Sequence, residues 1–293
     1  SAEVCQNSKE YNSGARDIDD AEWEAIRGLY DAELAHIDDQ LGRLFEWLRA
    51  EGKWDETMVV VCADHGELHG EHDLYGHEFC VYDPLVNVPL LIKHPDLDAD
   101  RRTDQVELLD LYHTVLDALD VPGDDPAVDD GAVPLDRTRS LLSDEYRGFD
   151  GLSESERDPG QRGDGEYAFV EYSRPVVELN QLEEKAAAAG ISLPSDSRFY
   201  SRMRAARRAD AKYVRIDRID DEAYRLDRDL GETNNLAAGD DPGIAATEAA
   251  LSEFESAVGG AWTDALDDDV DDDAVDRMDD EAQERLRDLG YLE

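Results

Sequence analysis

Apolar residues recur with a helical period near the start of this chain. They follow one another at steps of three and four, after Asp19 and Asp20 as candidate N-caps and with Glu22 as a capping-box partner. The stripe consists of Trp23, Ile26, Tyr30, Leu34, Ile37, Leu41, Leu44 and Leu48. The pattern predicts one long helix that ends at Gly52.

Two apolar runs without polar alternation follow the helix. Residues 57–63 and 88–92 are each typical of a strand buried on both faces of a parallel sheet, and the second is entered through Pro89. Thr103 is a candidate cap for a further helix that reaches Leu119. Helix, strand, loop, strand and helix is the order of an α/β fold.

The remainder of the chain predicts a smaller unit with short strands. These strands are expected at 167–172, 211–216 and 223–226, the last two as a hairpin. Residues 121–165 are rich in Pro, Gly, Asp and Arg and indicate surface loops, and a polar segment runs from 173 to 197. The acidic run 267–273 is expected as a solvated linker, and helical spacing returns at 281–292.

Charge changes the picture of the surface. Acidic residues outnumber basic ones by 74 to 29, which gives a formal net charge of −45. Self-repulsion of this size destabilises a compact state, but at about 1 M salt the Debye length falls to about 3 Å. We therefore expect a surface adapted to a salt-rich cytoplasm, with an acidic composition of the haloarchaeal kind. The regular apolar periodicity argues against a wholly disordered acidic protein.

Composition also excludes several classes of partner. A chain this acidic is expected to repel phosphate backbones and anionic lipid, so we expect neither nucleic-acid binding nor attachment to a membrane surface. No apolar stretch is long enough to span a bilayer, and no secretory signal is visible. Cys5, Cys62 and Cys80 are too sparse for a disulfide framework, which favours a reducing compartment. Cytoplasmic location is expected, with secretion left open because the sequence starts at Ser1.

Candidate chemistry is concentrated between residues 58 and 95. Asp64 and His65 stand at the end of the first predicted strand, and ligands of open α/β sheets lie beyond the carboxyl ends of strands. Four of the seven histidines fall between His65 and His77, together with several carboxylates. Imidazole and carboxylate donors suit a hard or borderline divalent cation, although the spacing matches neither a zinc finger nor HExxH. The structural alternative for Asp64 is a turn or cap residue.

Several separated stretches resemble the sulfatases of the alkaline phosphatase superfamily. They are Asp64-His65-Gly66-Glu67 with Gly70-Glu71-His72, Tyr82-Asp83 with Val88-Pro89-Leu90, VELLDLYHTVL at 106–116, EAYRLDRDLGETNNLA at 222–237 and LRDLGYLE at 286–293. The ordered set is much more specific than any single motif. It implies an alkaline-phosphatase-like α/β fold with a mixed, mainly parallel sheet covered by helices on both faces, plus a small C-terminal α+β subdomain with a short antiparallel sheet.

The resemblance also implies roles for individual residues. Asp64 and His65 match metal-binding positions, and His65 stands where many sulfatases have Asn and where phosphonate and phosphodiester hydrolases often have His. Calcium is the ion expected in a sulfatase, with magnesium or manganese left open. His77 lies next to the place of a sulfate-gripping lysine, which here holds Glu78, and it is the first catalytic candidate because imidazolium can donate a proton to the departing alkoxide. His72 is the second, in a role that orients the loop.

One part of the family pattern is absent from this sequence. The early Cys/Ser-x-Pro/Ala-Ser/Thr-Arg nucleophile motif and the aspartate pair before it are not found, and Cys5 to Lys9 share only its first spacing. We therefore expect the C-terminal part of a longer enzyme or a truncated gene product, with the formylglycine nucleophile only in the missing N-terminal part.

Three functions remain open at this stage. The first is hydrolysis of a small-molecule or saccharide sulfate monoester. Phosphodiester or phosphonate monoester hydrolysis is the second, and a non-catalytic remnant is the third. The expected domains are the α/β core with the metal loop at 1–120, a loop-rich insertion at 121–164, a C-terminal subdomain at 165–260, and an acidic linker with a terminal helix at 261–293. Oligomeric state leaves no readable trace.

The charge predicts a dependence of folding on salt. We expect the chain to lose its cooperative fold below about 1 M salt, because screening is then too weak for its surface charge. Circular dichroism during dialysis from molar KCl into dilute buffer measures this. A spectrum that does not change on dialysis contradicts the prediction.

Overall fold

The computed structural model describes residues 4–122, 135–143 and 167–258 and Trp262. Most of the predicted insertion at 121–164 lies outside these residues, as do the acidic linker and the terminal helix predicted at 261–293. Those three remain predictions. No helix in the described part of the chain combines the length and apolar character that crossing a bilayer requires.

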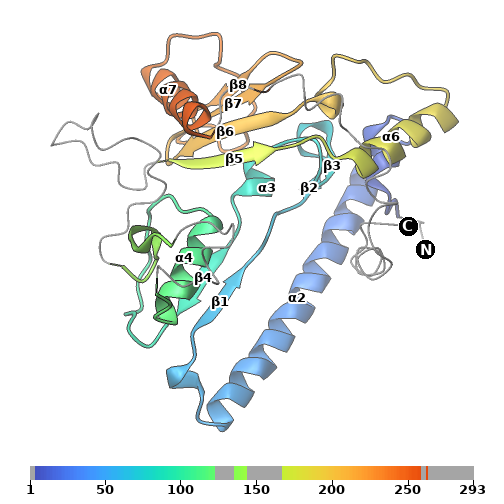
Figure 1. The fold of residues 1–293 in the computed structure, drawn as a ribbon. Helices are drawn as coiled ribbons and strands as arrows, with labels where there is room; N and C mark the ends of the chain where they lie inside the picture. The colour runs from blue at the N-terminus through green and yellow to red at the C-terminus, as the bar shows by residue number, and fades with distance from the viewer. Residues whose placement is uncertain (1–3, 123–134, 144–166, 259–261, 263–293) are drawn as a thin grey trace.

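The predicted long helix is α2, Asp20–Ala50, which runs along one side of the molecule (Figure 1). The Asp19 side chain accepts a hydrogen bond from the Glu22 amide at 2.9 Å, as expected of an N-cap. The predicted capping box does not form, because the Glu22 carboxylate instead accepts from Arg16 and from the amide of Cys5. A short helix, α1 (Ser8–Asn12), precedes α2.

Only the two ends of the apolar stripe on α2 are buried. Trp23 and Ile26 pack near the start of the helix, and Leu48 packs near its end, whereas Leu34 and Ile37 in the middle are about half exposed. Trp23 makes edge contacts with two tyrosine rings, of which one, Tyr75, belongs to strand β3 (Tyr75–Gly76). The period predicted the helix correctly, but the described residues cover only its ends.

The first two long strands pair with each other. β1 (Val59–Cys62) and β4 (Leu90–Lys93) are antiparallel, with Val59 opposite Lys93. All pairings among the described strands are antiparallel, so the parallel part of the expected sheet does not occur among them. A parallel pair needs a crossover, usually a helix. Here the connection holds only short elements and turns the chain back, and Cys62 at the end of β1 is exposed.

The connection between β1 and β4 contains a small hairpin and a short helix. β2 (Leu68–His69) pairs with β3, a 3-10 turn at Glu71–Asp73 joins them, and α3 (Asp83–Val86) follows. Leu68, Cys80 and Leu85 from this connection are buried in one apolar cluster with residues of the C-terminal unit. The loop is therefore a packed part of the core.

The helix predicted from Thr103 begins later, as α4 (Leu109–Ala118). Carboxylates just before α4 and in its first turn are held by hydrogen bonds to distant residues. The Glu107 carboxylate accepts from the Phe169 amide at 2.6 Å, and Asp110 accepts from the Arg139 guanidinium at 2.6 Å. Thr103 is exposed and does not cap the helix.

The C-terminal unit is a four-stranded antiparallel sheet in the order β5, β6, β7 and β8. Its strands are β5 (Ala168–Tyr172), β6 (Met203–Arg208), β7 (Ala211–Ile216) and β8 (Glu222–Tyr224). The predicted small antiparallel sheet and the β7–β8 pair are confirmed. Three elements were not predicted: β6, α6 (Val176–Ala188) in the segment expected as polar, and α7 (Pro242–Ala257), which covers the sheet (Figure 1).

A buried ion-pair cluster joins the two parts of the chain. The Lys212 side chain is fully buried, and its Nζ lies 3.1 Å from Asp83 Oδ1 and 2.8 Å from Glu232 Oε1. Arg207 adds a second cation 2.9 Å from Asp83, whose own amide donates to Glu232 Oε2 at 2.6 Å. The cluster therefore connects α3 of the loop to β6, to β7 and to the turn at 229–235.

Burial and charge act in opposite directions on the two carboxyl groups. Burial alone would raise the pKa of Asp83, but the adjacent Lys212 and Arg207 outweigh it and lower that pKa below the ordinary value. At Glu232 burial outweighs the attraction of Lys212, and the pKa is raised. Asp83 is thus the carboxyl group that the cluster stabilises in its ionised form.

Replacing Lys212 by methionine is expected to destabilise the fold strongly. The substitution leaves two carboxylates buried without their shared cation, which typically costs about 3–5 kcal/mol. Urea unfolding in molar KCl measures the free energy of unfolding. Lys185→Met is the matched control, since Lys185 pairs with Glu10 at 3.2 Å with its side chain 39% exposed and is expected to cost at most about 1 kcal/mol. Equal losses of unfolding free energy in the two variants would contradict the stabilising role given to the buried Lys212.

Asp83→Asn is expected to show a difference in stability that depends on pH. Because the pKa of Asp83 is lowered on folding, its stabilising contribution is complete above the unfolded value of about 3.9 and is lost as the pH falls through the folded pKa. The free energy of unfolding of the native chain minus that of the variant should be largest above about pH 5 and should shrink towards pH 3. A difference that stays constant from pH 7 to 3 would refute this.

Candidate functional site

Asp64 and His65 follow directly after β1, where the sequence predicted them. The Asp64 side chain is 80% exposed, and its Oδ1 accepts from the His65 amide at 2.9 Å. This backbone hydrogen bond lowers the pKa of Asp64. Its other oxygen, Oδ2, lies 3.8 Å from His65 Nε2. The first predicted pair of ligands is therefore adjacent in space and open to solvent.

Gly66 fixes the direction in which this pair leaves the strand. Its amide donates to the Leu85 carbonyl at 2.8 Å, and a Cβ built on Gly66 would lie 1.9 Å from the Pro84 carbonyl oxygen. Only a residue without a side chain can approach the backbone of α3 this closely. The loop is thereby attached to α3 one residue beyond His65.

The β2–β3 hairpin brings two distant loop residues together. Leu68 pairs with Gly76, so Glu67 and His77 occupy the next position of the same antiparallel register. Gly70 closes the turn with φ +100°, in the left-handed region that favours glycine. Residues ten positions apart in sequence therefore face each other at the open end of the hairpin.

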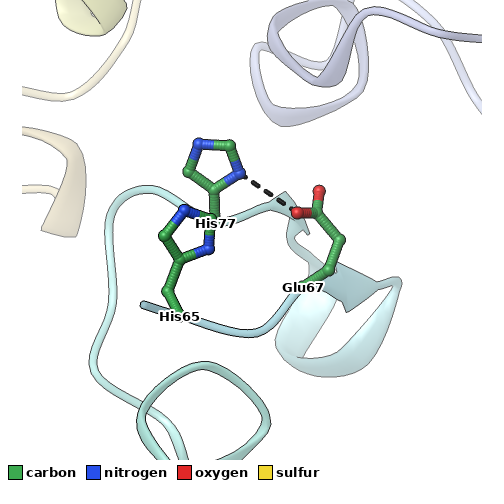
Figure 2. Close-up of side chains that lie close together, drawn as sticks. All are labelled: His65, Glu67 and His77. Atoms are coloured by element: carbon green, nitrogen blue, oxygen red, sulfur yellow. Dashed lines mark hydrogen bonds and ion pairs between the residues drawn. The ribbon is translucent and has the colours of Figure 1, made fainter. Parts of the chain in front are cut away.

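Three side chains gather at this end, as Figure 2 shows. His77 Nδ1 lies 3.1 Å from Glu67 Oε2, and the His65 and His77 rings stack with their centroids 4.3 Å apart. One donor atom from each of His65, Glu67 and His77 lies within 4.8 Å of the other two. His65 and His77, predicted as ligand and catalytic residue, thus share one site, and Glu67 joins them.

Neighbouring charges set the state of His77. Its hydrogen bond to Glu67 raises the pKa of the imidazole, and the nearby Glu78 carboxylate, 4.0 Å from Nε2, acts in the same direction. Lys9 pairs with the buried Glu78 and opposes that effect. His77 is held between two carboxylates, which favours the protonated ring that can donate to a leaving group.

A cavity of about 750 Å³ opens beside the site. His65, His77 and Asp64 lie on its wall, and apolar side chains such as Val86 and Phe169 line other parts of it. The wall therefore includes side chains of the metal loop and of the C-terminal sheet. A small organic ester fits a space of this size.

His72, the second predicted catalytic residue, lies elsewhere. Its ring stacks on Tyr82 with centroids 3.5 Å apart and an angle of 9° between planes, and burial lowers the pKa of its imidazole. His72 is not in the group of His65, Glu67 and His77 and does not line the cavity. The structure thus brings together three of the four predicted site residues, and a catalytic role for His72 stays a prediction.

Two residues of the site received no role from the sequence. Glu67 belongs to the recognised motif, and its place two residues after His65 was the available signal. Lys9 carried no signal, because it is 69 residues from Glu78 in sequence and reaches it only through the packing of α1 against β3. Long-range ion pairs of this kind require the fold.

Solved structures with a similar fold define the class of protein. The phosphonate monoester hydrolase of Agrobacterium radiobacter has a TM-score of 0.54 and 26% identity, and the match covers 80% of this chain and 42% of that one. A 2-O GAG sulfatase, BT1596, has a TM-score of 0.57 at 18% identity, with 89% and 50% covered, and shows the fold alone. The fold is that of the alkaline phosphatase superfamily.

Sequence comparisons identify the family within this class. Residues 4–121 match the family model described as Sulfatase. A multifunctional alkaline phosphatase superfamily protein of Trinickia caryophylli is 35% identical over 135 residues, which are 44% of this chain and 24% of that protein. Arylsulfatase K of Bos taurus is 37% identical over 98 residues, which are 33% and 18% of the two chains.

Residues 4–121, the segment that carries the site, therefore match the sulfatase family, to which the sequence motifs showed a resemblance. The chain spans half or less of the length of these relatives.

Proposed function

We propose that this chain forms part of a sulfatase that hydrolyses an organic sulfate monoester. The observation that carries the proposal is the position of Asp64, His65 and His77 at the wall of one cavity, within a sulfatase-family segment. In this reaction a nucleophile from polypeptide outside this sequence attacks sulfur, the S–O bond to the organic group breaks, and water later releases sulfate. The substrate class is a small-molecule or saccharide sulfate ester.

The charges around the site support a metal-assisted reaction. Asp64, Glu67 and Glu78 are carboxylates close to the imidazoles, and this much negative charge opposes the approach of an anionic ester. A divalent cation, when bound, supplies positive charge that offsets the repulsion and polarises the ester oxygens. We propose that Asp64 and His65 take part in holding it.

His77 is proposed as the general acid. Its Nδ1 is held by Glu67, which fixes the ring and favours its protonated form. The other nitrogen, Nε2, is then the atom that donates a proton to the departing alkoxide oxygen. Glu67 and Glu78 act on the reaction only through the orientation and charge of this ring.

Hydrolysis of a phosphonate monoester or phosphodiester is the second candidate. The similarity in fold to the phosphonate monoester hydrolase at 26% identity supports it, as does His65 at a position where Asn is usual in the sulfatases that the motif resembles. Rates on 4-nitrophenyl sulfate, phenylphosphonate monoester and bis-4-nitrophenyl phosphate, measured on the native gene product in molar KCl, separate the two. A higher kcat/KM on either phosphorus ester would favour the second candidate.

His77→Ala is expected to lower kcat strongly on an alkyl sulfate and weakly on 4-nitrophenyl sulfate. Loss of a general acid costs about 10²–10⁴ in rate when the leaving group needs a proton, whereas 4-nitrophenolate departs without one. The exposed α2 residue His36, replaced by alanine, is the control, and neither rate should change there. Equal losses on the two esters would reject His77 as the acid.

A further inference from the structure

We propose that the stack of His72 on Tyr82 is a pH-sensitive contact that holds the β2–β3 hairpin closed only while the His72 imidazole is neutral. The hairpin carries Glu67 and His77 at its open end, so the contact regulates the candidate site from outside it. This consequence rests on the function proposed above. The contact itself is tested without turnover, so it and ester hydrolysis can fail separately.

The turn that makes this contact has a strained backbone. His72 has φ 57° and ψ 25°, and Asp73 has φ 56°, so two successive residues with side chains lie in the left-handed region. Such a conformation costs free energy and persists where surrounding contacts impose it. The stack on Tyr82 is a contact of this kind, made by the first of the two strained residues.

Tyr82 is a fixed support for the imidazole. The two rings lie with their centroids 3.5 Å apart and with an angle of 9° between their planes. Tyr82 is 4% exposed, directly precedes α3 and packs in one apolar cluster with Leu68 and Leu74 of the hairpin. The stack therefore ties the closed end of the hairpin to the core beside α3, and its loss frees that end first.

A cation already lies beside Tyr82. The Arg198 guanidinium donates to the Tyr82 hydroxyl at 2.7 Å, and its Cζ lies 5.1 Å from the centre of the ring. A proton on His72 adds a second positive charge to the same partly buried aromatic group, and like charges repel. Attraction between an imidazolium and the face of Tyr82 gives less support here, because that ring already interacts with Arg198.

The other charges that face His72 do not offset this repulsion. They come from the turn itself and from the C-terminal unit, and together with Arg198 they are Glu71, Lys212 of β7, Glu222 of β8 and Asp229. Glu222 already pairs with Arg198, and Asp229 accepts hydrogen bonds from the amides of Thr233 and Asn234. Burial acts most strongly against the proton, the two cations add to it, and the pKa of His72 is lowered although Glu222 and Glu71 oppose the shift.

The direction of the pH effect follows from the lowered pKa. A released His72 has the ordinary pKa of about 6.5, whereas the stacked imidazole takes up a proton only at lower pH. Stabilisation by the stack is therefore complete above about pH 6.5 and is lost as the pH falls through the folded value. Glu67 and His77 lie directly outside the paired residues Leu68 and Gly76, so loosening of the hairpin separates them.

The test is hydrogen exchange of the full chain in molar KCl at about pH 7.5 and about pH 5.5, with rates corrected for the intrinsic pH dependence of exchange. We expect protection of the amides of residues 68–76 to fall at least about threefold at the lower pH, while the amides of β7 keep theirs. His72→Phe keeps an aromatic ring that takes up no proton, and it should show no fall. His36→Phe, on the exposed part of α2, is the matched control and should fall as the native chain does.

Two further measurements support the same test. The imidazole ¹H resonances of His72 should titrate with a midpoint below about 6.5. His72→Ala, which removes the ring, should show at both pH values the low protection that the native chain shows at the lower one. A fall of the same size in His72→Phe as in the native chain, a His72 midpoint at or above about 6.5, or full protection of the hairpin in His72→Ala would each overturn the proposal.

Discussion

The buried ammonium of Lys212 is the interaction on which the rest of the structure depends. It lies between Asp83 at the start of α3 and Glu232 in the turn at 229–235, and it is fully buried. α3 in turn accepts the Gly66 amide through Leu85, and Gly66 follows His65. A cation in the C-terminal sheet therefore fixes, through two short connections, the direction in which the site loop leaves β1. Removing solvent from three charged groups is costly, and only their mutual attraction and their hydrogen bonds offset it.

A buried cluster of this kind suits the high salt that the acidic composition predicts. Salt screens exposed charges within a few ångströms, so most ion pairs on the surface of this chain contribute little in a salt-rich medium. Ions do not enter the packed interior, and the contacts of Lys212 and Arg207 with Asp83 keep their strength there. The chain has 29 basic residues, and placing some of them inside joins the two parts of the fold in a way that bulk salt does not weaken.

The sequence predicted features that depend on neighbouring residues. It did not predict features that depend on contacts between distant residues. The 3.6-residue period predicted α2, and apolar runs predicted β1, β4 and β5, because neighbours in sequence determine these features. The period could not show that the middle of α2 stays exposed, and β1 was expected in a parallel sheet although it pairs antiparallel with β4. The motifs located Asp64, His65 and His77, but the place of Glu67 in the site depends on the β2–β3 register. The arginine-rich β6 was missed because its arginines pair with carboxylates that are distant in sequence.

The site combines a fixed backbone with side chains whose tips can move. Both properties follow from how the residues of the loop are packed. Gly66 is pressed against α3, and Phe79, two residues after His77, is fully buried with its amide bonded to the Tyr172 hydroxyl at 2.8 Å. The backbone is thus fixed on both sides of the imidazoles, while the imidazoles and the Glu67 carboxylate keep partial exposure. A fixed backbone with movable tips preorganises the donors and still lets them close on an ion or a proton acceptor. Changing one donor then alters the chemistry of the site without changing the fold that carries it, which is consistent with sulfatases and phosphonate hydrolases sharing this fold.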